Sequence, residues 1–197
     1  MAKIVVSEFI SLDGVIETPQ NWHMSYINED MGAATMEQLL GADVLLYGRN
    51  TYDEMAGVWP HMKNNEYGIA DKLNSAPKYV VSNTLQSTDW NHTTIISGDV
   101  VDAISKLKQD TDGVIAITGS GTLIASLLPT GLIDEYQLMV HPVVVGKGKH
   151  LFPDGADVKL KLTGTQTFAS GVILLTYVSD TAASDSGAPV SEGVQAG

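Results

Sequence analysis

Short apolar runs rich in β-branched residues recur along the chain, and this recurrence most constrains its fold. The pattern predicts eight strands, at residues 3–11, 43–47, 78–82, 93–97, 114–118, 134–145, 159–168 and 172–178. Apolar residues at helical spacing predict helices at residues 25–40, 52–55, 66–74, 100–108 and 122–128. Strands that alternate with helices and then follow one another directly predict a mixed α/β sandwich that closes with an antiparallel hairpin.

The run 114–118 leads through Gly119 and Gly121 into a helical stretch that ends before Pro129. A strand that enters a helix through a glycine turn leaves free backbone N–H groups at the helix start, which suit a phosphate group. The alternative is a tight turn that needs glycine for steric reasons alone.

Composition limits the classes of protein to consider. The 197 residues suit one domain at residues 1–179, followed by a small, polar segment at 180–197 that reads as a disordered acidic tail. The net charge of −12 disfavours a nucleic-acid partner, and no apolar run reaches the ~18 residues of a membrane span. The absence of cysteine excludes disulfides and thiolate metal sites. Without a signal-peptide pattern, a cytoplasmic location is expected.

The chain has one arginine, Arg49, and it lies at a second junction between a strand and a helix. A guanidinium beside Gly48 and Thr51 offers a charge-assisted phosphate contact. The alternative is a surface arginine paired with one of many acids. Two such junctions in one α/β domain favour a ligand with two separated phosphate groups, such as a dinucleotide.

Several common motifs are absent. The turn after residue 118 lacks the third glycine of the Rossmann fingerprint, and no P-loop, HExxH or GxSxG motif occurs. The five histidines show no ligand spacing, so no metal site is predicted.

Four blocks resemble the reductase domain of the riboflavin-biosynthesis deaminase–reductases, which has a dihydrofolate-reductase-like fold. They are Ser11-Leu-Asp-Gly14, Gly48-Arg-Asn-Thr51, Lys78-Tyr-Val-Val-Ser-Asn-Thr-Leu85 and Gly119-Ser-Gly-Thr-Leu123. The segment 134–152 also resembles the long strand of that family and the Gly-x-Gly-x-x-Leu-Phe that follows it. The resemblance implies a three-layer α/β/α sandwich with a mostly parallel sheet and antiparallel C-terminal strands. It also implies a small-molecule substrate and a homodimer.

The resemblance further implies that the chain binds NADPH. By similarity, the phosphate region would be held by Gly48, Arg49 and Thr51, and the adenosine end by Ser82, Asn83 and Thr84. The pyrophosphate would be held by Gly119, Ser120, Gly121, Thr122 and Leu123. Asn83 stands where a basic residue often grips the 2′-phosphate, so a preference for NADPH over NADH depends on Arg49. Ser120 replaces the second of two adjacent glycines in folate reductases, which keeps the turn but leaves their cis peptide bond unsupported.

Reduction of a C=N or C=O bond needs a proton donor as well as a hydride. Asp13, at the end of the first strand, is the candidate, with an ordered water as an alternative source of the proton. Its alternative role is to stabilise the turn at Gly14. The sequence therefore predicts an NAD(P)H-dependent reductase of a small heterocyclic or carbonyl substrate, with a non-catalytic nucleotide-binding module as the alternative.

Overall fold

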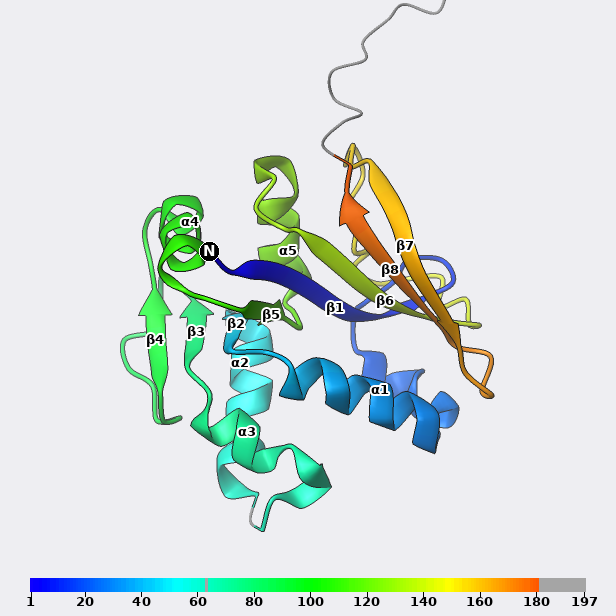
Figure 1. Ribbon diagram of the computed structural model, residues 1–197, viewed down its shortest axis with the longest axis horizontal. Coiled ribbons are helices and arrows are strands. Elements are labelled where there is room, and N and C mark those ends of the chain that lie inside the picture. Colours follow the sequence, from blue (N-terminus) through cyan, green and yellow to red (C-terminus); the bar gives the residue numbers. More distant parts are fainter. Residues whose placement is uncertain (63, 181–197) are drawn as a thin grey trace, which may run out of the picture.

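The computed structural model describes residues 1–62 and 64–180. Within this part of the chain, one eight-stranded sheet forms the centre, in the order β4-β3-β2-β5-β1-β6-β8-β7 (Figure 1). The strands are β1 (Lys3–Ser11), β2 (Val44–Gly48), β3 (Lys78–Val81), β4 (Thr93–Ile96), β5 (Val114–Ile117), β6 (Glu135–His141), β7 (Leu160–Thr167) and β8 (Ile173–Ser179). The strands from β4 to β6 pair in parallel, and β8 is antiparallel to both β6 and β7. The predicted mixed sheet with antiparallel C-terminal strands is confirmed.

The helices follow the predicted order, but only the helix predicted at 100–108 starts at the predicted residue, and the helix predicted at 66–74 starts at residue 70. They are α1 (Glu29–Leu40), α2 (Arg49–Ala56), α3 (Ala70–Ser75), α4 (Val100–Asp110) and α5 (Gly121–Leu127). The predicted helix at 25–40 begins later because the Asn28 side chain caps α1 by accepting the Met31 N–H at 2.9 Å. Helix α2 begins directly after β2, three residues before the predicted start at 52. Strand β6 is shorter than the predicted 134–145, since Pro142 cannot donate a backbone hydrogen bond.

Helices cover both faces of the sheet, as Figure 1 shows: α4 and α5 lie on one face, and α1, α2 and α3 on the other. On the first face, Ile104 of α4 and Ile124 of α5 are fully buried in the main apolar cluster. On the second face, Tyr52 of α2 and Leu73 of α3 pack around Tyr47. The predicted three-layer α/β/α arrangement is therefore confirmed.

The connections that leave β2 and β5 run in opposite directions. From β2 the chain passes through α2 and α3 to β3, and from β5 it passes through α5 to β6 on the other side. Ligands of open α/β sheets bind in the crevice at the carboxyl ends of two such strands. The topology thus places a candidate site between the start of α2 and the start of α5.

The predicted tail, residues 180–197, lies outside the described residues except for Asp180. Among the helices in the described ranges, none has the length and apolar character needed to cross a membrane.

Candidate functional site

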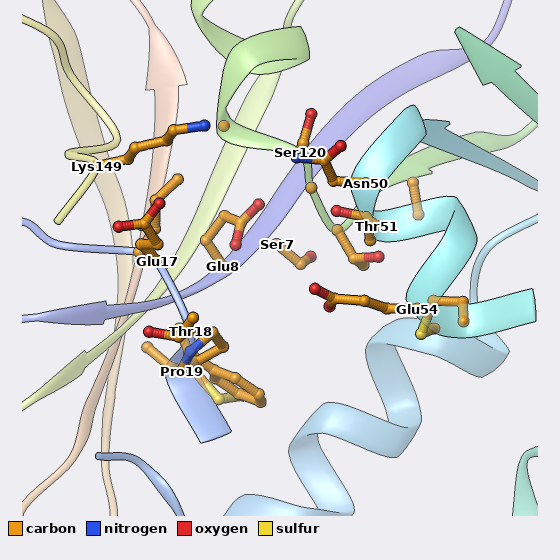
Figure 2. Close-up of a pocket in the computed structure, with 18 of the residues that line it drawn as sticks. Ser7, Glu8, Glu17, Thr18, Pro19, Asn50, Thr51, Glu54, Ser120 and Lys149 are labelled. Atoms are coloured by element: carbon orange, nitrogen blue, oxygen red, sulfur yellow. The ribbon is translucent and has the colours of Figure 1, made fainter. Parts of the chain in front are cut away.

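A pocket of about 420 Å³ opens between the starts of α2 and α5, and β1 crosses its floor. Figure 2 shows its lining, which comes from β1, the loop after it, α1, α2, the turn before α5 and the loop after β6. The polar side chains of this lining are Ser7, Glu8, Glu17, Thr18, Asn50, Thr51, Glu54, Thr118, Ser120 and Lys149, with Thr35, Gln38 and Thr122 beside them.

The two junctions between strand and helix contact each other directly. The Gly48 N–H donates a hydrogen bond to the Gly119 carbonyl oxygen at 3.1 Å. Gly119 has φ of +115°, and a Cβ there would lie 2.5 Å from Oγ1 of Thr51. The Gly119–Ser120 peptide bond is cis, which the sequence did not support. Glycine at position 119 is required both by its backbone conformation and by the closeness of Thr51.

Five of the residues expected to bind the cofactor line this pocket: Thr51, Gly119, Ser120, Gly121 and Thr122. Gly48 lies behind them as the N-cap residue of α2. The Leu123 side chain packs in the apolar core and is only 4% exposed, so only its backbone could face a ligand.

Arg49 and the predicted adenosine-end residues form a separate group beyond the pocket. The Nε of Arg49 donates to both carboxylate oxygens of Asp53, at 2.9 and 2.7 Å, and Nη1 lies 3.4 Å from Oγ1 of Thr84. Ser82 accepts the backbone N–H of Thr84 at 3.2 Å. Asn83 accepts a backbone N–H from the loop after β4 at 3.1 Å, which occupies its amide oxygen. Arg49 therefore contacts Thr84, whereas the amide oxygen of Asn83 is bonded to the backbone of the protein.

Asp13, the expected proton donor, does not line the pocket. Its carboxylate accepts hydrogen bonds from the Ser11 hydroxyl at 2.7 Å and from the backbone N–H groups of Val145 at 3.0 Å and Gly146 at 2.7 Å. These bonds, with that of Ser11 the strongest influence, lower the pKa of Asp13 to about 2. An ionised, fully engaged carboxylate cannot supply a proton at neutral pH. These bonds tie the turn after β1 to the loop after β6, whereas the N–H of Gly14 in that turn donates to the Ser11 carbonyl oxygen.

Glu8 of β1 lines the pocket, although no motif marks it. Its side chain is half-buried, and its Oε1 is shielded from solvent without a hydrogen-bond partner among the described residues. Burial raises the pKa of Glu8 to about 8. A glutamate in the middle of an apolar central strand is unusual, because a buried charge is costly. That position in the run 3–11 is the signal by which the sequence could have identified it.

Two more buried polar atoms of pocket residues lack a partner within the described ranges: Nε2 of Gln38 and Oγ1 of Thr118. Since buried polar groups are normally hydrogen-bonded, their clustering here indicates a site for a polar ligand. Among the described residues of the lining, Lys149 is the only basic one, and Glu17 and Glu54 add acidic groups.

A second hollow of about 460 Å³ adjoins the pocket along α1 and shares Phe9 and Thr35 with it. The rest of its lining is apolar apart from the Tyr67 hydroxyl: Ile27, Met31, Gly32, Met36, Trp59, Tyr67 and Ile69. The site therefore offers a pocket of mixed polar and apolar lining next to an almost entirely apolar one.

Comparison with known proteins identifies relatives along nearly the whole described chain. The model of the RibD C-terminal domain family matches residues 2–174. The uncharacterized protein YyaP of Bacillus subtilis (strain 168) is 32% identical over 182 residues, which cover 89% of this chain and 94% of YyaP. YwjB of the same organism is 29% identical over 177 residues, which cover 87% and 95% of the two chains.

Solved structures share the fold. A putative riboflavin biosynthesis protein from Shewanella sp. PV-4 superposes with a TM-score of 0.71 at 24% identity, over 90% of this chain and 99% of that one. Dihydrofolate reductase from Enterococcus faecalis, solved with NADP(H), gives a TM-score of 0.62 at 14% identity, over 90% and 96% of the two chains. The fold is dihydrofolate-reductase-like, as the sequence resemblance implied.

Proposed function

The chain belongs to the RibD C-terminal domain family, and on this basis we propose that it is a reductase that uses NADPH, with NADH as the alternative donor. The acceptor is a small heterocyclic or carbonyl compound. The observation that carries the proposal is that one pocket joins the glycine turn before α5 to Glu8, a half-buried carboxyl group.

The residues of the pocket fit a nicotinamide dinucleotide. The backbone N–H groups of residues 119–122 and the Thr51 hydroxyl suit the diphosphate. Oγ1 of Thr118 is buried without a partner among the described residues and so offers a hydrogen bond to a ligand. Arg49, at the first position of α2, and Thr84 suit a second phosphate group. When bound, the cofactor supplies the hydride.

The apolar lining would keep water from the reacting atoms. Phe9, Leu39, Met55 and Met139 contribute hydrocarbon and sulfur surface to the pocket wall. Exclusion of water strengthens electrostatic interactions in the site and prevents loss of protons to solvent. These side chains would thus hold the substrate's reducible bond in a dry environment.

The first substrate to assay is the riboflavin precursor 5-amino-6-(5-phosphoribosylamino)uracil, which the family resemblance suggests. Lys149 is the basic side chain of the lining available to its phosphate group. Because Glu17 and Glu54 lie in the same lining, uncharged heterocycles and carbonyl compounds belong in the same panel.

Calorimetric titration with NADPH and NADH, followed by assay of cofactor oxidation against this panel, tests the proposal. We expect NADPH to bind and at least one compound to be reduced. Binding without oxidation of any compound would favour the nucleotide-binding module, and absence of binding at millimolar concentration would exclude the reductase.

A homodimer remains a prediction. Leu162 of β7 and Ile173 of β8 are 48% and 38% exposed, and they provide apolar surface on the last strands for a second copy. Light scattering of the purified protein measures the assembly directly.

A further inference from the structure

Glu8 lies on β1, two residues past the point where β5 stops pairing with β1. The pairing of β1 with β5 ends at Val6 and Ile117, whereas β1 continues beside β6. Glu8 therefore borders the pocket at an edge of β1 that β5 does not cover. Figure 2 shows its carboxyl group in the middle of the pocket, between Lys149 and Thr51.

Within residues 1–62 and 64–180, no counter-charge is in direct contact with this carboxyl group. None of the ion pairs among the described residues joins Glu8 to Lys149. Glu17 and Glu54, the other carboxylates of the lining, are exposed to solvent and add negative charge around the pocket. Burial raises the pKa of Glu8 to about 8, so that it carries a proton at neutral pH.

We propose that Glu8 is the acid that protonates the substrate, on the heteroatom of the double bond that is reduced. The proposal rests on the proposed function and assigns the proton donor of that reaction. Asp13 cannot take this role because its carboxylate is outside the pocket and fully hydrogen-bonded. Glu17 and Glu54 are exposed to solvent, whereas Oε1 of Glu8 is shielded from it.

The step balances with NADPH as the reductant. The hydride adds to the carbon of the substrate's C=N or C=O bond, and the π electron pair of that bond moves to the nitrogen or oxygen. This heteroatom takes the proton of the Glu8 carboxyl group, whose O–H bond breaks to leave a carboxylate. The substrate gains two electrons, NADPH becomes NADP⁺, and the carboxylate regains a proton from water after the product leaves.

The protonation of Glu8 can be measured without cofactor or substrate. We expect infrared titration of the ligand-free protein to show a carboxyl group that loses its proton with a midpoint near pH 8. Glu8→Gln should abolish this signal. The matched control Glu37→Gln, at an exposed position of α1 outside the pocket, should retain it. Absence of the signal from the wild-type protein would overturn the proposal.

Kinetics with a compound reduced by the wild-type protein test the proton transfer. Glu8→Gln should lower kcat at pH 7 by about 100-fold or more, with the Kd of NADPH within about threefold of wild type. Glu8→Asp should recover part of the rate, and the fall of wild-type kcat above pH 8 should vanish from the residual activity of Glu8→Gln. An unchanged kcat in Glu8→Gln would overturn the role of Glu8 alone, whereas failure of the wild type to bind NADPH would overturn the proposed function.

Discussion

Gly48 and Ser120 approach each other so closely that a Cβ at Gly48 would lie 2.1 Å from Oγ of Ser120 and 3.0 Å from its Cβ. Real Cβ atoms do not approach other atoms to this distance, so the β2–α2 and β5–α5 junctions depend on the absence of a side chain at position 48. The floor of the proposed cofactor site is built on this contact.

Gly48→Ala should push the two junctions apart. Because overpacking of this kind costs about 1–3 kcal/mol, we expect the Kd of NADPH to rise about tenfold or more in calorimetric titration. Adding Ser120→Gly removes two of the three nearest atoms and should restore part of the affinity. Gly32→Ala is the matched control, since its added Cβ would have no described atom within 4 Å apart from its chain neighbours and the nearby backbone of its own helix. Wild-type affinity in Gly48→Ala would contradict the prediction.

Arg49 should determine the preference for NADPH over NADH. Its guanidinium is paired with Asp53 and reaches Thr84 from the first turn of α2. A charge-assisted hydrogen bond contributes about 1.5–3 kcal/mol, so Arg49→Ala should weaken NADPH binding about tenfold or more and leave NADH binding nearly unchanged. Asp53→Asn releases the guanidinium and should strengthen NADPH binding. Equal losses of affinity for NADPH and NADH would show that Arg49 contacts a part that the two cofactors share.

Asp13→Asn should affect stability rather than proton transfer. The folded pKa of Asp13, about 2, lies below its ordinary value of 3.8, so the stabilisation is present above pH 3.8 and is lost as the pH falls through 2. At pH 7 we therefore expect a lower Tm by calorimetry, with kcat/KM within about threefold of wild type. Asp154→Asn, at an exposed loop position, is the control for Tm. A loss of kcat/KM without a loss of Tm would contradict this prediction and show that Asp13 takes part in the reaction.

The strands could be predicted from the sequence because their signal is local. The run 3–11 coincides with β1, and the last two runs form the expected hairpin. Two of the bounds that were wrong depend on single residues, Asn28 as a helix cap and Pro142 as the end of β6. The insertion of β5 between β2 and β1 could not be derived from local patterns, because it depends on contacts between distant segments.

For the site, too, the local motifs could be predicted from the sequence, but the contacts between them could not. Each glycine junction is visible alone, but the contact of Gly48 with Ser120 appears only when β2 and β5 pair. Asp13 and Glu8 lie on or just after the same strand, and the sequence alone does not show which of the two carboxyl groups has the higher pKa. The pKa of Asp13 is lowered by hydrogen bonds from the Ser11 hydroxyl and then from the loop after β6, whereas the pKa of Glu8 is raised by burial. Both causes require the folded chain.

His23 and His141 should make the fold sensitive to acid. Their ring centroids lie 5.9 Å apart, and Phe9 stacks on His23 at 4.6 Å. Burial lowers the pKa of both rings below the ordinary 6.5, and the charge of His141 lowers that of His23 further. Below pH 6.5 these two rings therefore bind more protons in the unfolded chain than in the folded one, and their contribution to stability is lost as the pH falls.

Urea denaturation at about pH 7.5 and about pH 5.5 measures this loss as a difference in the free energy of unfolding. Between the two pH values His141→Gln should lose less stability than the wild type does, because one of the two groups with a lowered pKa is gone, whatever its effect on stability at pH 7.5. The raised pKa of Glu8 acts in the opposite direction and contributes equally to both proteins. His61→Gln, at an exposed position, should leave the difference as in the wild type. If His141→Gln kept the full difference, the acid sensitivity would have to arise from other groups. The pair of buried rings would then have no part in it.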